Sequence, residues 1–165
     1  MTFEPLLSAS LAIQIHACAA IMAIFLGALA LGRKRRDRLH KTAGYIWIVL
    51  MAVVAISTVF ITAEVGPTVA GFGVIHIFSV VVLVSLCVGL RAAVRRDIAL
   101  HRKTMRALYI QSLGITGLFT LLPGRRMNEV LFSSAPLAGI VVIVLGGAVI
   151  AWLTIPRKSA QTAPA

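Results

Sequence analysis

Four histidines are the residues of this chain that could do chemistry. His16 and His76 lie within long apolar runs, and His40 and His101 lie in the basic segments that follow those runs. Imidazole is the commonest protein ligand for metals and an axial ligand of haem iron. An ionisable side chain inside an apolar run is costly to bury, so it is by default a candidate functional residue. The histidines therefore predict a cofactor site, with iron bound only through haem.

The two basic segments have similar sequences. Residues 33–42 read Arg-Lys-Arg-Arg-Asp-Arg-Leu-His-Lys-Thr, and residues 95–104 read Arg-Arg-Asp-Ile-Ala-Leu-His-Arg-Lys-Thr. Each follows an apolar run that holds one of the other histidines, so we predict an internal repeat of residues 7–63 and 71–122. At 1.5 Å per residue, about 24 Å of helix separate His16 from the first segment. We expect an outer pair, His16 with His76, and an inner pair, His40 with His101.

An aspartate precedes each inner histidine. Asp37 lies three positions before His40 and Asp97 four positions before His101, so each carboxylate could share a helix face with its histidine. Such a carboxylate would orient the imidazole toward a metal. Alternatively, the inner histidines contact lipid headgroups and the aspartates cap helices or pair with arginines.

The outer histidines and the arginine pair at 125–126 also allow more than one interpretation. A hydrogen bond between helices, such as one from His16 to Ser79, would satisfy an outer histidine without any cofactor. Arg125 and Arg126 follow a Pro-Gly turn and could bind an anion: a haem propionate, an anionic headgroup or a carboxylate substrate. Stabilising the C-terminal dipole of the preceding helix is the alternative for this pair.

The elements that must position these residues are membrane-spanning helices. Of the 165 residues, 59% are hydrophobic, which is too many for a water-soluble domain of this size. The predicted fold is a single all-α transmembrane domain, 1–165, with a four-helix core, a fifth C-terminal span and a disordered tail at 159–165. The predicted spans are about 7–31, 43–63, 71–93, 104–122 and 136–155. The runs lack the alternation of a membrane β-barrel.

The positive charges predict how these spans are oriented. The chain has 16 lysines and arginines against five acidic residues. With five spans, every basic residue except Arg125 and Arg126 falls on one side of the membrane. By the positive-inside rule the two basic segments, 33–42 and 95–104, which we call the first and second hinges, are cytoplasmic, as is the C-terminus, and the N-terminus is outside. Basic residues in short connectors meet anionic lipid headgroups, so nucleic-acid binding is not expected.

Small residues predict where helices approach one another closely. At steps of four and three from His16 lie Ala20, Ala23, Gly27 and Ala30, a stripe that fits a neighbouring helix backbone or a flat cofactor. Near the first hinge, Trp47 fits an anchor at the membrane interface or packing against lipid.

Several of these motifs resemble a known family. They are the run from His16 to Ala20 and on to Ala28, Leu39-His-Lys-Thr-Ala-Gly-Tyr45, Gly73-Val-Ile-His76, the hinge from Arg95 to Arg102, and Pro123-Gly-Arg125. Together they resemble a bacterial membrane-protein family, domain of unknown function 2306, which implies a multi-span inner-membrane protein without an established activity. More distantly, the paired histidines are similar to cytochrome b561 and ferric-reductase-like proteins. That resemblance implies an outer haem on His16 and His76 and an inner haem on His40 and His101. Dense positive charge beside the inner histidines departs from that pattern, so the resemblance favours the outer pair.

Two functional hypotheses follow. In the first, the protein is a b-haem electron carrier or a subunit of a membrane oxidoreductase. In the second, it is a non-catalytic membrane protein that stabilises or regulates a partner complex or binds lipid. No catalytic residue is predicted under either hypothesis. A transporter of small solutes is disfavoured, because the predicted spans carry no acidic relay.

Overall fold

The computed structural model describes residues 2–33, 36–61 and 74–154. Parts of the predicted first hinge and second and third spans, and the predicted tail at 159–165, lie outside these residues. The described chain forms α1 (Glu4–Leu7), α2 (Leu11–Gly32), α3 (Arg38–Ser57), η1 (Thr58–Phe60), α4 (Val74–Val94), α5 (Ile98–Leu108), η2 (Tyr109–Ile115), α6 (Thr116–Phe119), α7 (Arg126–Phe132) and α8 (Ala138–Thr154).

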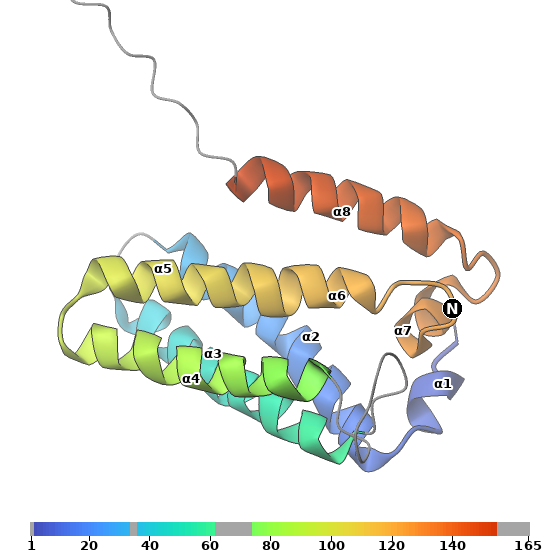
Figure 1. Cartoon of the computed structure of the whole chain (residues 1–165), viewed down its shortest axis with the longest axis horizontal. Coiled ribbons are helices and arrows are strands. Elements are labelled where there is room, and N and C mark those ends of the chain that lie inside the picture. The colour runs from blue at the N-terminus through green and yellow to red at the C-terminus, as the bar shows by residue number, and fades with distance from the viewer. Residues whose placement is uncertain (1, 34–35, 62–73, 155–165) are drawn as a thin grey trace, which may run out of the picture.

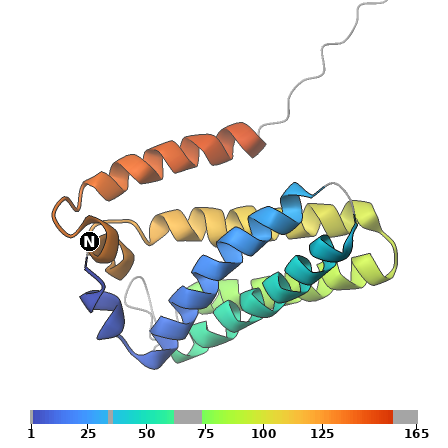
Figure 2. The same ribbon diagram turned by 180° about the vertical axis from the view of Figure 1, so that it is seen from behind.

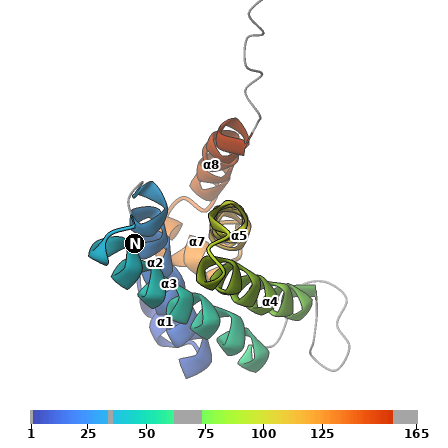
Figure 3. The same ribbon diagram turned by 90° about the vertical axis from the view of Figure 1, so that its left-hand side faces the viewer.

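Four long helical rods form a bundle (Figure 1). Helices α2, α3 and α4 are three of the rods, and the fourth is the unbroken helical run α5–η2–α6, whose middle part is a π-helix. The four rods are arranged in a ring: α3 packs against α2 and α4, α5 packs against α4, and η2 contacts α2. Figures 2 and 3 show these rods side by side, from behind and along the bundle. Consequently α3 and α5, which carry the inner histidines, are diagonal partners.

Three helices are long and apolar enough to cross a membrane: Leu11–Gly32, Arg38–Phe60 and His76–Val94. They correspond to the first three predicted spans. The first begins at Leu11 rather than Leu7, because Pro5 starts the separate helix α1 and the chain turns at Ser8. The shorter apolar helix α8 lies along the fourth rod, apart from the other three (Figures 1 and 3).

The core is built from all four rods. Its buried residues are Ala23, Trp47, Met51, Ala55, Val82, Leu86, Met105, Leu108 and Leu113. On α2 the buried residues are Ala19, Ala23, Gly27 and Ala30, so three positions of the predicted small-residue stripe face the bundle. Trp47 is only 3% exposed, so its predicted place at the lipid interface is wrong. The indole is buried because Gly27, on the facing helix, leaves room for it: a Cβ there would lie 2.5 Å from Trp47 Nε1.

The second hinge is a tight turn. Helix α4 ends in a Schellman motif: the N–H of Asp97 donates to Ala92 O and the N–H of Arg96 to Ala93 O. Arg96 has a φ of 62°, in the left-handed region that usually requires glycine. Asp97 then caps α5 directly. The turn thus reverses the chain and fixes where His101 enters the fourth rod.

Candidate cofactor site

The two inner histidines lie in the first turns of their helices. Asp37 Oδ1 accepts a hydrogen bond from the backbone N–H of His40 at 2.9 Å, at the start of α3. Asp97 Oδ1 accepts one from the N–H of Leu100 at 3.0 Å, at the start of α5. Both carboxylates are therefore helix N-caps, which is one of the two roles that the sequence left open.

Backbone carbonyls, rather than these carboxylates, orient the imidazole rings. His40 Nδ1 lies 3.0 Å from Ala30 O, and His101 Nδ1 lies 2.9 Å from Gly89 O. Because a carbonyl oxygen only accepts, each Nδ1 must carry the hydrogen, which leaves Nε2 as a lone-pair donor. This is the tautomer of a histidine that binds a metal through Nε2. Each ring is held by the helix that precedes it in the chain.

His40 and His101 line one cavity of about 270 Å³ at the hinge end of the bundle. All four rods contribute to its walls. The lining residues are Gly27, Ala30, Leu31, Arg33, Arg36, His40, Lys41, Gly44, Tyr45, Trp47, Ile48, Leu90, Ala93, Ile98, His101, Arg102 and Met105. Within the described residues, Trp47 Nε1 is buried without a hydrogen-bond partner. An indole N–H left in this state is costly, so a ligand atom that accepted from it would relieve the cost.

Glycine positions allow the rods to approach at this end. A Cβ on Gly89 would lie 1.9 Å from Met105 Cε, so the bare backbone of Gly89 lets α5 come close. This approach places Gly89 O within reach of the His101 ring. The missing side chain at Gly27 likewise lets Trp47 and Tyr109 come close to α2. The Tyr109 hydroxyl donates to Ile24 O at 3.0 Å. These contacts are consequences of packing between helices far apart in the sequence.

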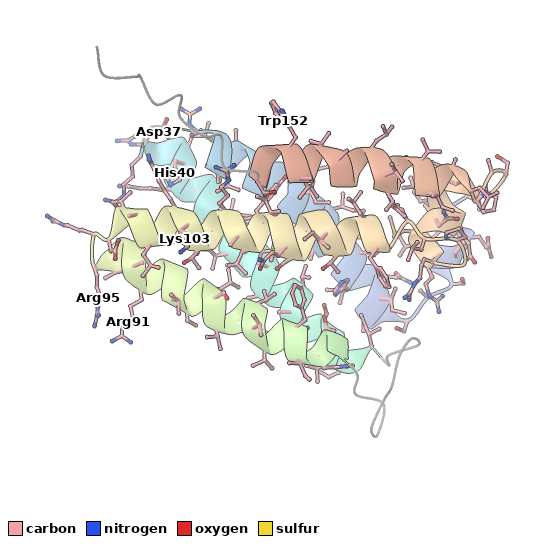
Figure 4. The ribbon with its side chains drawn as sticks, turned by 45° about the horizontal axis from the view of Figure 1, so that its top comes forward. Asp37, His40, Arg91, Arg95, Lys103 and Trp152 are labelled. Atoms are coloured by element: carbon pink, nitrogen blue, oxygen red, sulfur yellow. The ribbon has the colours of Figure 1, made fainter. Side chains whose placement is uncertain are left out.

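The cavity is surrounded by positive charge. Arg33, Arg36, Lys41 and Arg102 all line it. Figure 4 shows Asp37 and His40 at the same end of the bundle as Arg91 and Arg95. Arg33 pairs with Asp37, and this hydrogen-bonded guanidinium lowers the pKa of Asp37 from 3.8 to about 2. The hinge therefore keeps an ionised carboxylate among an excess of cations, and its net field attracts anions.

The outer histidines are also placed by the helices. His16 Nδ1 lies 3.0 Å from Ser57 Oγ and 3.1 Å from Val54 O, so the ring of His16 bonds to α3. His76 is buried on α4. These contacts give His16 a serine partner, though on α3 rather than the Ser79 suggested by the sequence. An outer haem on His16 and His76 stays a prediction.

Arg125 and Arg126 lie at the opposite end, where α7 begins. Arg125 is the N-cap residue of α7, and its guanidinium carbon lies 4.9 Å from the centre of the Phe119 ring. This cation–π contact holds Arg125 against the end of α6. Gly124, with a φ of 80°, makes the turn that brings the two arginines to this position. Their predicted role in binding an anion stays a prediction.

The donor set at the inner cavity limits the kind of metal centre it fits. Among the described residues, no group of three or more His, Cys, Asp or Glu side chains could hold a metal ion. A structural zinc ion needs four protein ligands and a catalytic one needs three. Two imidazoles, in contrast, are the complete protein contribution to a haem iron with two axial histidines. Within the described chain, the inner histidines therefore fit haem better than a bare ion.

Comparison with known families identifies the chain. The family model described as "Predicted membrane protein (DUF2306)" matches residues 13–155. Comparisons with curated proteins and with solved structures found no match. They give no support to the more distant resemblance to cytochrome b561. The chain belongs to the DUF2306 family of predicted membrane proteins.

Proposed function

We propose that this member of the DUF2306 family binds a b-type haem in its inner cavity and carries electrons, alone or as a subunit of a membrane oxidoreductase. The observation that carries the proposal is the pair of diagonal histidines, His40 and His101, which line one cavity. Each has its Nδ1 hydrogen bonded to a carbonyl, so each Nε2 is available for iron. Bound haem would supply a centre that gains and loses one electron.

The other lining residues suit a flat, anionic macrocycle. Ala30 and Gly44 are small residues in the lining, and the N–H of Trp47 offers a hydrogen bond. The volume of about 270 Å³ lies just below the range of about 300–1,000 Å³ for small-molecule sites. A haem would therefore keep its propionate edge in the mouth of the cavity. Arginine and lysine side chains at the mouth would bind the propionates there.

The membrane arrangement belongs to the same proposal. We infer five spans, with the fourth rod and α8 added to the three long helices, in the inner membrane of a bacterium. The hinges face the cytoplasm and anionic lipid headgroups, and a membrane protein partner would receive or supply electrons. Reporter domains fused after residue 36 and after residue 61 test the orientation. We expect cytoplasmic activity at the first site and external activity at the second; the reverse would refute it.

A visible absorption spectrum tests haem binding. Protein purified in mild detergent from haem-replete cells should show a Soret band that sharpens on reduction. The double variant His40→Ala, His101→Ala should lose the spectrum of the inner haem. The matched variant His16→Ala, His76→Ala should keep that spectrum and lose only what a second, outer haem contributes.

Two results would contradict the proposal. One is a colourless wild-type protein from cells with ample haem, which would leave the non-catalytic alternative. The other is a haem spectrum that the inner double variant does not alter. Size-exclusion chromatography of each variant shows whether the bundle is intact. The more conservative variant His101→Met keeps a ligand for iron and should shift the reduction potential rather than abolish binding.

A further inference from the structure

A second hollow lies between α4 and the fourth rod and is distinct from the histidine cavity. Its volume is about 260 Å³. The lining residues are Phe78, Val81, Val82, Ser85, Leu100, Lys103, Thr104, Ala107, Leu108, Gln111 and Ser112. Val81 is 52% exposed and Leu100 is 41% exposed, so the hollow opens on the outside of the bundle. In a membrane this surface faces lipid, and we call the hollow the lateral groove.

Two polar side chains in the lateral groove have no partner in the described protein. The Gln111 side chain is exposed and makes no hydrogen bond to a described residue. Ser112 also lines the groove, and its Oγ is buried, likewise without a partner among the described residues. Hydrocarbon offers no water to satisfy an amide or a hydroxyl. A molecule that accepts hydrogen bonds would therefore bind here more favourably than an acyl chain.

The backbone at this position is unusual. Gln111 and Ser112 both belong to η2, the π-helix from Tyr109 to Ile115. π-Helices account for well under 1% of residues and often occur at functional sites, because their extra residue shifts side-chain directions. Gln111 and Ser112 lie three and four positions after Leu108 and line the groove with it, while Tyr109 bonds to α2.

Depth decides the chemical class of the occupant. Gln111 lies about 10 Å along the rod from residue 104, where the predicted fourth span begins, and the hydrocarbon core is about 30 Å thick. Gln111 is thus well inside the core, and the ester carbonyls of phospholipids lie at its edge. A quinone with an alkyl or isoprenoid tail can enter the core and carries two carbonyl oxygens, which only accept hydrogen bonds.

We propose that the lateral groove binds the head of a lipid-soluble quinone, with Gln111 and Ser112 donating hydrogen bonds to its carbonyl oxygens. The side chains of Phe78, Val82 and Leu108 form apolar walls for the ring. The lateral groove shares no lining residue with the histidine cavity, so this proposal can fail independently of haem binding.

Photolabelling tests quinone binding. The full-length protein in phosphatidylethanolamine–phosphatidylglycerol nanodiscs is exposed to a decyl-benzoquinone carrying a photoreactive azide, with unlabelled decyl-benzoquinone as competitor. Mass spectrometry should map the label to peptides of α4 and the fourth rod. Gln111→Leu should raise the Kd at least tenfold, and Ser112→Ala should also weaken binding. Gln14→Leu is the matched control, since the Gln14 amide instead donates to Leu7 O and Ala9 O.

Other results of the labelling experiment would contradict quinone binding. Labelling that Gln111→Leu leaves unchanged, or that spreads over α8, overturns the proposal. Loss of a dimer in Gln111→Leu with unchanged labelling would assign the groove to a second copy, and tightly held phospholipid without quinone would assign it to lipid. The variant Gln111→Asn keeps an amide and should bind with intermediate affinity, which separates lost binding from lost folding. Colourless His40→Ala, His101→Ala protein should still be labelled.

Discussion

The docking of α8 against α6, the turn after it and α7 can be tested with three glycines of α8. A Cβ on Gly139 would lie 2.2 Å from Leu121 O and 2.3 Å from Asn128 Nδ2, whereas ordinary contacts begin near 3.4 Å. A Cβ on Gly146 would lie 2.7 Å from a methyl of Leu118, and one on Gly147 would meet nothing within 4 Å. We predict that alanine is destabilising at Gly139, intermediate at Gly146 and mildly stabilising at Gly147.

The expected magnitude at Gly139 follows from what must move. Asn128 is 1% exposed and donates to Leu121 O at 2.7 Å and to Pro136 O at 2.9 Å. Losing both hydrogen bonds costs about 1–3 kcal/mol, and the overpacking costs about 1–3 kcal/mol more. The better helix propensity of alanine returns at most about 1 kcal/mol. Gly139→Ala should therefore weaken the docking of α8 by about 3 kcal/mol, and Gly147→Ala should strengthen it by less than 1 kcal/mol.

Hydrogen exchange measures this difference at α8 itself. A loss of about 3 kcal/mol in the free energy of local opening corresponds to roughly 100-fold faster amide exchange. Mass spectrometry of peptides from α7 and α8, in the same detergent, should show this increase for Gly139→Ala and none for Gly147→Ala. Peptides from α2 and α3 serve as the internal reference. Equal exchange of α8 in the two variants would show that α8 does not rest on Leu121 and Asn128.

Three further predictions concern the hinges and the cavity wall. Gly27→Ala should destabilise the bundle by about 1–2 kcal/mol in detergent unfolding, because aromatic rings press on Gly27, while Gly44→Ala, with no neighbour within 4 Å, should not. Wild type should lose its stability advantage over Asp37→Asn as the pH falls from about 4 toward 2. Arg33 lowers the pKa of Asp37 from 3.8 to about 2 in the folded state, so the ionised carboxylate contributes fully to stability above pH 3.8 and loses this contribution as the pH falls through about 2. If wild type stayed more stable than the variant below pH 2, the advantage would not come from the ionised Asp37. Arg96→Gly should raise the melting temperature, since glycine adopts the positive φ at this turn without strain and is worth about 1 kcal/mol there; a lower melting temperature would contradict this reading.

The helices could be predicted because hydrophobic runs and charged hinges are local features. The runs gave the three long helices to within a few residues at the ends that the structure describes. The first span was predicted four residues too long at its start, since apolar content does not reveal the break between α1 and α2. The π-helix could not be predicted, because no residue type in Tyr109–Ile115 requires an i→i+5 hydrogen-bond pattern.

The site could be predicted only in part, because its geometry depends on contacts between helices. The aspartates were recognisable as either caps or ring partners, and only the turn geometry decides between these roles. The carbonyls of Ala30 and Gly89 carry no signal in the sequence, since every residue has one. The sequence places Trp47 near a hinge, which is typical of an aromatic residue at the membrane interface. Only the structure shows that Gly27 faces it and leaves room for its burial. The small-residue stripe on α2 was the signal that could have suggested this.

The proposal of an inner haem gives the hinge charges a different meaning from the one they have in the sequence. In the sequence, the positive charge near His40 and His101 argued against the inner pair. In the folded chain, several of the same charged residues line one cavity together with both histidines and Trp47, whose N–H has no partner in the described chain. A dianionic macrocycle needs an apolar slot with cations at one edge, and a solvated hinge supplies those cations without burying them. The hinge charge is therefore an argument for the haem proposed at the inner pair, and His16, whose contacts to Val54 and Ser57 are made by Nδ1, also keeps its Nε2 open for an outer haem.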